Sequence, residues 1–132
     1  QRGCRKGFKI FRRIMEAAIE IANKYYKERL EAIENIEKDL KILIKKVKEI
    51  LDDAEIYLFG SYVKGTFNKF LSDVDILIVS DKIPEKAIER AKIRLKIKES
   101  IGRRYFIFQL HLMKREDFQI FKNFIDKLVR IA

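Results

Sequence analysis

Phe59 to Val79 reads F-G-S-Y-V-K-G-T-F-N-K-F-L-S-D-V-D-I-L-I-V, and this stretch decides the fold. Its beginning closes a short apolar run, after which Gly60 and Gly65 provide turn signals. From Asp73 the chain becomes a β-branched run that is too short for a helix and is typical of a strand. The stretch therefore predicts two strands joined by a glycine-containing connection.

Two carboxylates open the second of these strands. Asp73 and Asp75 are two positions apart, so their side chains point to the same face with Cα atoms roughly 6 to 7 Å apart. Neighbouring carboxylates repel each other, and solvent or a cation must neutralise them. Oxygen ligands favour Mg²⁺ or Mn²⁺, which in turn hold phosphates. The alternative is a solvent-exposed strand start that binds nothing.

The turn after the first strand has a composition suited to an anion. Gly60 permits close backbone approach, and the residues after it can begin a helix whose free N–H groups face a negative charge. Ser61 adds a hydroxyl donor. An ordinary strand-ending turn explains the dipeptide equally well, so the joint pattern with the two aspartates carries the hypothesis.

Upstream of the first strand, the chain is helical. Phe8 to Leu51 contains no Gly or Pro, and apolar residues recur at helical spacing. The stripe comprises Ile14, Ala18, Ile21, Tyr25, Ile33, Ile36, Leu40, Ile44, Val47 and Leu51. This length exceeds that of an ordinary globular helix, so the segment either breaks near Asn35 into a hairpin of two helices or projects as one rod.

The remaining pattern alternates strands and helices, which predicts an α/β fold: a mixed sheet of about three strands packed by helices. The prediction places residues 1–33 in an N-terminal helical extension and residues 34–132 in the main domain. The predicted elements are a strand at Glu55 to Phe59, a strand at Asp73 to Val79, a helix at Glu85 to Ile101 after Pro84, a strand at Tyr105 to Met113, and a helix at Glu116 to Ile131.

Composition bounds the remaining possibilities. A chain of 132 residues, 48% of them hydrophobic, suits one domain, and no apolar run approaches the roughly 18 residues that a membrane helix needs. We therefore expect a soluble, cytoplasmic protein without a membrane partner. Cys4 and one histidine exclude a zinc site of Cys and His ligands, so any metal must be held by oxygen. The abundance of Lys, Glu and Ile leans toward the composition of a thermophile.

The net charge of +10 favours an anionic partner, either a nucleotide, a nucleic acid or an acidic protein surface. The basic residues are mostly interleaved with Glu, which is also how a solvated helix face looks. Nucleic-acid binding is the weakest of the three readings, because no stacking motif or DNA-reading element accompanies the charge.

The segment from Phe59 to Val79 resembles the signature of the minimal nucleotidyltransferases, small members of the DNA polymerase beta-like superfamily. The resemblance implies that Gly60 and Ser61 bind the β and γ phosphates of a nucleoside triphosphate such as ATP. It also implies that Asp73 and Asp75 hold Mg²⁺ that bridges those phosphates during transfer of a nucleotidyl group. Lys64 and Lys69 lie in the intervening loop and are expected phosphate neighbours, although exposed loop lysines are commonly only solvated.

The family's third carboxylate is expected on the third strand. Strand alternation places Ile107, Gln109, His111 and Met113 on the face turned toward the aspartates. Gln109 stands where the resemblance expects an acid, and a neutral amide is a poorer Mg²⁺ ligand and no base. His111 could serve as a base or be an ordinary strand histidine. Glu116 and Asp117 could turn toward the site, but are better placed to begin the last helix.

Two functions remain open. The first is an active enzyme that transfers AMP or another nucleotide to a hydroxyl of a protein, a small molecule or RNA. The second is a weak or inactive member that acts as a binding partner, for example as antitoxin to a HEPN-domain toxin, as the resemblance suggests. The N-terminal extension would suit such a partner, or it packs on its own core or on a second copy in a homo-oligomer.

Overall fold

The computed structural model describes the backbone of residues 2–132 and the side chains from Arg5 onward. Cys4 therefore lies outside the described side chains. The elements are α1 (Arg2–Glu34), α2 (Ile36–Ile50), β1 (Glu55–Phe59), α3 (Ser61–Lys64), β2 (Val74–Val79), α4 (Ala87–Ile101), η1 (Arg103–Ile107), β3 (Phe108–Met113), α5 (Arg115–Phe121), η2 (Lys122–Phe124) and β4 (Leu128–Arg130). None of the helices in this described part is both long enough and apolar enough to cross a bilayer.

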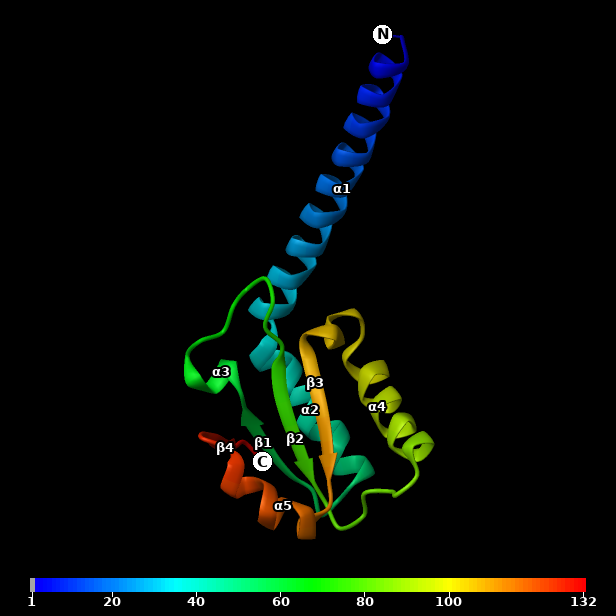
Figure 1. Cartoon of the computed structure of the whole chain (residues 1–132). Helices are drawn as coiled ribbons and strands as arrows, with labels where there is room; N and C mark the ends of the chain where they lie inside the picture. Colours follow the sequence, from blue (N-terminus) through cyan, green and yellow to red (C-terminus); the bar gives the residue numbers. More distant parts are fainter. Residues whose placement is uncertain (1) are drawn as a thin grey trace.

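One mixed sheet organises the domain, with strand order β3-β2-β1-β4. β1 is antiparallel to both β2 and β4, whereas β2 and β3 are parallel. The parallel pair is joined through α4, as a crossover connection requires. Figure 1 shows α2 behind the sheet, α4 to the right of β3 and α5 at the lower left of the sheet. The prediction of an α/β fold with a mixed sheet is confirmed.

The sheet buries its two faces unequally. The face turned to α2 and α4 forms the main core, with residues such as Leu43, Ile56, Ile76 and Ile97 completely buried. The opposite face has a smaller cluster of Leu77 and Val79 under Phe118 of α5. This second cluster includes only the C-terminal part of β2, so the N-terminal part of the same face lacks a helical cover.

The long N-terminal helix breaks at Asn35, as one of the two alternatives predicted, but it does not fold back as a hairpin (Figure 1). The Asn35 amide Nδ2 donates a hydrogen bond to the Glu31 carbonyl at 2.8 Å, and its backbone N–H bonds to Ala32 at 3.2 Å instead of continuing the α-helical pattern. An Asn side chain competes in this way with the helical backbone. α1 consequently projects from the domain while α2 packs inside it.

The C-terminal prediction was partly wrong. The helix expected over Glu116 to Ile131 ends at Phe121, and the chain then adds β4 to the edge of β1, giving four strands. The exposed edge of β1 explains this outcome: Ile131 N donates to Ile56 O at 2.8 Å, and Ile56 N donates to Ala132 O at 3.0 Å. Satisfying backbone groups of an edge strand outweighs the helical periodicity of the sequence.

The predicted third strand was also too long. Residues from Arg103 to Ile107 form a 3₁₀ turn, and the strand begins only at Phe108. As a result Ile107 is buried in the main core rather than on the face of the aspartates, and Phe106 is partly exposed. Gly102, with φ of 87°, ends α4 and redirects the chain so that no continuous strand can form here.

Candidate functional site

Gly60 is the tightest point of the candidate site. Its φ is 78°, a conformation that favours glycine, and it directly precedes Ser61, the first residue of α3. A Cβ at position 60 would lie 2.4 Å from Oδ2 of Asp75. Gly60 is therefore required both by its backbone and by the carboxylate beside it, which places the turn and Asp75 against each other as the sequence pattern anticipated.

Asp75 occupies the centre of an open patch on the sheet. It pairs with Phe59 of β1 on one side and with Gln109 of β3 on the other. Its side chain is 25% exposed, that of Asp73 is 44% exposed, and Gln109 is exposed. Because residues in register share a face, Gln109 lies beside Asp75 as the strand alternation predicted.

His111 reaches the same patch from two positions beyond Gln109 along β3. Its Nε2 atom is buried and has no hydrogen-bond partner in the described structure, and Oδ1 of Asp75 lies 3.5 Å away. That separation permits attraction to a protonated ring but is too long for a good hydrogen bond. The ring also packs on Phe59, with centroids 5.2 Å apart. A buried nitrogen of this kind can be satisfied by a water molecule or by a bound ligand.

Arg29 of α1 was not predicted as a site residue. The arginine is only 2% exposed, and its guanidinium donates to the carbonyls of Lys69 and Ser72 at 2.7 and 2.5 Å. Its Nη1 lies 3.7 Å from Oδ1 of Asp73. The sequence signal was the position of Arg29 in the helical register of Tyr25 and Ala32, where an apolar residue is expected.

The same loop is held to α1 by a second contact. Tyr26 stacks on Phe70 with ring centroids 4.9 Å apart and an interplanar angle of 17°. Asn68 orders the loop internally by accepting hydrogen bonds from the Phe70 and Leu71 backbone amides through its Oδ1. The loop that delivers Asp73 is thus fixed to the N-terminal helix by a buried cation and an aromatic stack.

The two predicted loop lysines take different positions. Lys64 Nζ lies 3.3 Å from Oδ2 of Asp126, so it is engaged with the C-terminal segment. Lys69 is exposed, and only its backbone carbonyl has a described contact, with Arg29. Neither lysine has a described contact with Asp73 or Asp75. Their role as phosphate neighbours stays a prediction.

Glu116 and Asp117 lie in the first turn of α5, at the opposite end of β3 from Gln109. They border a separate surface hollow with Pro84 and Lys114. This placement agrees with their expected helix-starting role. Among the described side chains, no group of three or more His, Cys, Asp or Glu residues is arranged to hold a metal ion. A third acid beside the two aspartates is therefore not found in that part of the chain.

Comparison with known proteins assigns the family. The family model described as "Nucleotidyltransferase domain" matches residues 40–130, which are 91 of the 132 residues. The chain belongs to the nucleotidyltransferase domain family. The matched region contains the Gly60 turn, both aspartates and Gln109, so the resemblance seen in the sequence is confirmed at the level of the family.

Individual relatives of this nucleotidyltransferase domain agree. A "putative protein adenylyltransferase" of Methanocaldococcus jannaschii is 38% identical over 52 residues, which are 38% of this chain and 35% of that protein. The alignment thus spans about a third of the curated relative. A crystal structure of a "putative nucleotidyltransferase" is 32% identical, with a TM-score of 0.49, over 74% of this chain and 99% of the other.

A second crystal structure, of a "putative nucleotidyltransferase" from Sulfolobus solfataricus, has a TM-score of 0.51 at 21% identity. It covers 78% of this chain and 85% of the other. Its likeness supports the fold of the domain.

Proposed function

We propose that this nucleotidyltransferase domain binds a nucleoside triphosphate, with ATP as the best candidate, together with Mg²⁺ or Mn²⁺ at the patch formed by Gly60, Ser61, Asp73 and Asp75. The observation that carries the proposal is the contact between the Gly60 turn and Asp75, where a Cβ would meet the carboxylate at 2.4 Å. This contact brings a backbone suited to phosphate and a carboxylate suited to a cation into one place.

The donor set suits one divalent cation better than two. Asp73 and Asp75 offer hard anionic oxygens, and Gln109 offers a neutral amide oxygen next to Asp75. Bound there, the cation would neutralise the triphosphate charge and favour departure of pyrophosphate. Arg29 would keep Asp73 in position, while Gly60 and Ser61 leave room for the phosphates. The open part of the sheet beside Gln109 would admit the hydroxyl that receives the nucleotide.

The acceptor is the finer part of the proposal. We propose transfer of AMP to a hydroxyl of a protein or of RNA, and the name of the Methanocaldococcus relative, a "putative protein adenylyltransferase", favours protein. Gln109 cannot accept a proton as a carboxylate would, so the rate is expected to be low for this family.

A second candidate function follows from the same glutamine. A domain that binds nucleotide but transfers it slowly can serve as a binding partner, and α1 projects with exposed apolar side chains that suit a protein contact. A HEPN-type toxin is the partner suggested by the resemblance. Transfer of labelled nucleotide to an added HEPN protein, or complex formation without transfer, distinguishes the two functions.

Thermal unfolding tests nucleotide binding directly. ATP with Mg²⁺ at about ten times the dissociation constant stabilises a folded domain by about 1.4 kcal/mol, which raises the Tm of a chain this size by roughly 5 °C. We expect this rise for the wild type and none for the Asp73→Asn, Asp75→Asn double variant.

EDTA supplies the control for the metal, because ATP alone should then give no shift. Glu99→Gln supplies a matched control for the loss of an exposed carboxylate on α4, and it should retain the full shift. If no nucleoside triphosphate with Mg²⁺ or Mn²⁺ at millimolar concentration raises the Tm of the wild type, the site assignment is wrong.

A further inference from the structure

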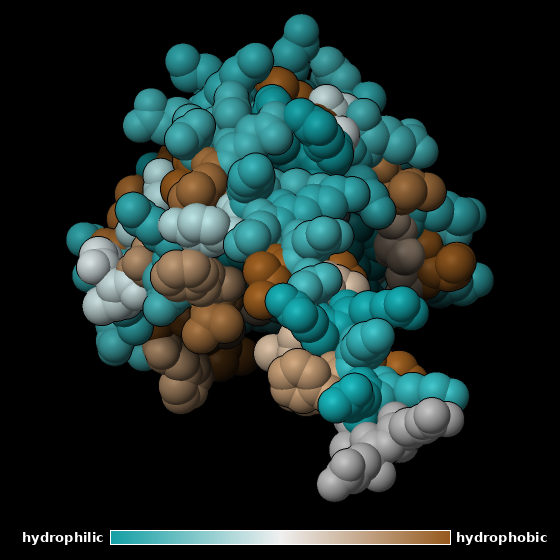
Figure 2. All heavy atoms as spheres, turned by 90° about the horizontal axis from the view of Figure 1, so that it is seen from above, coloured by the Kyte–Doolittle hydropathy of each residue, from teal (hydrophilic) through white to brown (hydrophobic). Residues whose placement is uncertain are grey.

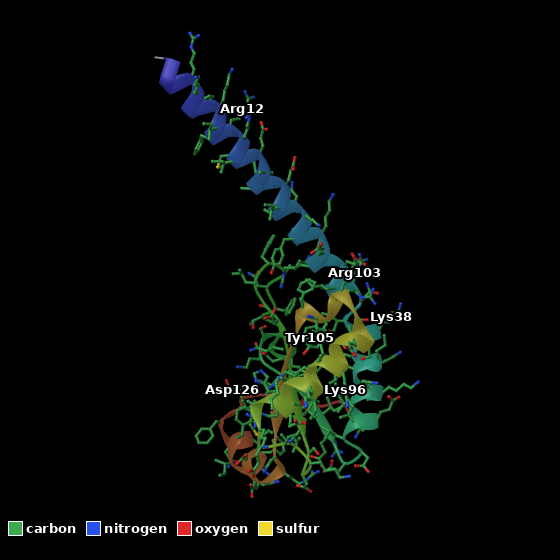
Figure 3. The ribbon with its side chains drawn as sticks, turned by 90° about the vertical axis from the view of Figure 1, so that its right-hand side faces the viewer. Arg12, Lys38, Lys96, Arg103, Tyr105 and Asp126 are labelled. Atoms are coloured by element: carbon green, nitrogen blue, oxygen red, sulfur yellow. The ribbon has the colours of Figure 1, made fainter. Side chains whose placement is uncertain are left out.

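The projecting part of α1, residues 5–25, exposes more apolar surface than a free helix can sustain. Figures 1 and 3 show it extending away from the domain, with Arg12 far from the region of Arg103 where the helix meets the body of the protein. Its large apolar side chains are between 45% and 70% exposed: Phe8, Ile10, Phe11, Ile14, Met15, Ile19, Ile21 and Tyr25. At 100° per residue they occupy an arc of roughly 200°. An isolated helix of this length is only marginally stable in water.

One stripe of this surface has the spacing of a coiled coil. The positions repeat in alternating steps of three and four: Phe8, Phe11, Met15, Ala18, Ala22 and Tyr25. Continued in the same steps, the stripe reaches Arg29 and Ala32, which the protein's own domain buries. The packing seam of α1 therefore begins inside the domain and runs outward into solvent. Figure 2 shows hydrophobic residues on the projecting helix and on the domain beside its base.

We propose that the projecting parts of α1 from two copies of this chain pair antiparallel along this stripe. The order of large and small side chains favours that direction. In antiparallel register Phe11 faces Ala22 and Met15 faces Ala18 of the other copy, so in these central layers a large residue meets a small one. A parallel pair would place Phe11 on Phe11 and leave successive layers of facing alanines, which pack poorly.

The distribution of charge along α1 also favours antiparallel pairing. Residues 5–13 contain five basic side chains and no acidic one, whereas residues 16–28 contain Glu16, Glu20 and Glu28 together with Lys24 and Lys27. Antiparallel pairing therefore lays the strongly basic end of each helix beside a nearly neutral part of the other. Parallel pairing would align two basic ends within the Debye length of about 8 Å, where their repulsion is not screened.

Aromatic side chains would also meet at each end of the antiparallel pair. Phe8 of one copy would reach Tyr25 of the other, whose ring centroid is 6.4 Å from that of the partly exposed Phe106. Ile14 and Ile21 would flank the seam and cover each other across the pair. The pairing would bury on the order of 1,200 Å² in total, which reaches the size of a specific interface.

Solution mass and a matched pair of variants test the proposal. We expect a dimer of the full chain by analytical ultracentrifugation at micromolar concentration. Ala22→Glu places a charge in the seam and should raise the dimer dissociation constant at least 100-fold, whereas Asn23→Glu, on the polar side of the helix, should leave it within threefold. Circular dichroism confirms that both variants stay folded. A monomeric wild type, or equal effects of the two variants, would overturn the proposal.

Cysteine cross-linking tests the direction. In a Cys4→Ser background, Phe11→Cys and Ala22→Cys proteins are oxidised separately and after mixing. Antiparallel pairing predicts a disulfide only in the mixture, because position 11 of one copy meets position 22 of the other. Cross-linking of Phe11→Cys with itself would show a parallel pair and overturn the assignment. If the wild type is monomeric and instead forms a stable complex with a different protein, the proposal is also overturned, because that protein would then cover the stripe.

Discussion

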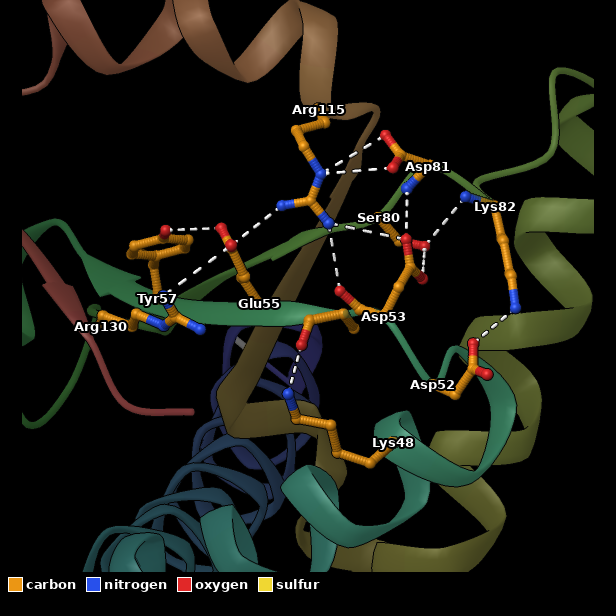
Figure 4. Close-up of polar contacts among 11 residues, drawn as sticks. Lys48, Asp52, Asp53, Glu55, Tyr57, Ser80, Asp81, Lys82, Arg115 and Arg130 are labelled. Atoms are coloured by element: carbon orange, nitrogen blue, oxygen red, sulfur yellow. Dashed lines mark hydrogen bonds and ion pairs between the residues drawn. The ribbon is translucent and has the colours of Figure 1, made fainter.

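The two ends of the sheet hold carboxylates in opposite ways. At the far end, Arg115 contacts three acids: Nη1 lies 2.9 Å from Glu55, Nε lies 3.4 Å from Asp81, and Nη2 lies 3.6 Å from Asp53 (Figure 4). Asp53 also accepts a hydrogen bond from the buried Ser80 hydroxyl, which lowers the pKa of the Asp53 carboxyl. These acids are matched by groups from within the chain.

At the candidate site, the acids are not matched by internal groups in this way. Among the described side chains, Arg29 is the one Arg or Lys that pairs with either aspartate: it lies 3.7 Å from Asp73 and uses its shortest hydrogen bonds on two backbone carbonyls. His111 Nε2 has no hydrogen-bond partner in the described structure. The difference is that the candidate-site acids remain available to an added cation, whereas the acids at the far end already have an internal one.

The largest effect is expected from Gly60→Ala. The substitution adds backbone strain at φ of 78° and a Cβ only 2.4 Å from Asp75 Oδ2, so the carboxylate or the turn must move. We expect a loss of about 3 kcal/mol in stability and no Tm shift with Mg²⁺ and ATP. Chemical denaturation and thermal melts measure the two effects.

Gly65→Ala is the control for strain alone. Gly65 has nearly the same φ, 77°, but open space where a Cβ would stand. It should cost about 1 kcal/mol and preserve the nucleotide-dependent shift. Equal effects of the two alanines on nucleotide binding would mean that contact with Asp75 is unimportant.

The next prediction compares how much a charged residue at each end of the sheet contributes to stability. Arg115→Met removes the cation shared by three acids and should destabilise the protein more than Asp75→Asn, which should change the stability by less than about 0.5 kcal/mol. Urea denaturation at neutral pH measures both. If Asp75→Asn proves the more destabilising, the candidate-site acids are structural.

Acidic pH should reduce the destabilisation caused by Arg115→Met. Hydrogen bonds from Ser80 and Tyr57 hold the pKa values of Asp53 and Glu55 below their ordinary values. Their stabilisation is present above the unfolded pKa values of about 4 and is lost as the pH falls through the lowered values. The cost of Arg115→Met should therefore shrink below about pH 4.

The smallest of the three effects is expected from Gln109→Glu. A third carboxylate beside Asp75 should raise the Mg²⁺ affinity about tenfold, or 1.4 kcal/mol, and should increase transfer of labelled nucleotide. Gln119→Glu adds the same charge on the exposed surface of α5 and should change neither quantity. Rapid transfer by the wild type that Gln109→Glu leaves unaltered would show that another group fulfils the role of the third acid.

The local pattern around Asp73 was readable from the sequence because strand alternation and the Gly60 turn are short-range features. They located Asp75, Gln109 and His111 on one face before any contact was known. β4 was missed because its stability depends on the edge of β1, which lies far away in the sequence. Arg29 was missed for a similar reason, since its partners Lys69 and Ser72 are 40 and 43 positions away.

The N-terminal boundary of the domain also depends on contacts between residues that are far apart in the sequence. The sequence placed residues 1–33 in an extension, and that division stays a prediction, but Arg29 and Ala32 are buried with the main domain. Helical periodicity does not reveal at which residue a helix leaves its core, because an apolar stripe looks the same in both parts. The contacts of α1 with the loop before β2 and with η1 mark this residue in the structure.

The hydrogen bonds from Arg29 to the loop before β2 limit where the chain can be truncated for expression. A fragment starting at residue 40, where the family match begins, would keep both aspartates but leave the carbonyls of Lys69 and Ser72 without their donor. Phe70 would also lose Tyr26, and the loop would gain freedom just where Asp73 emerges. A shortened protein should therefore begin no later than about Ala22, one helical turn before the first of these contacts.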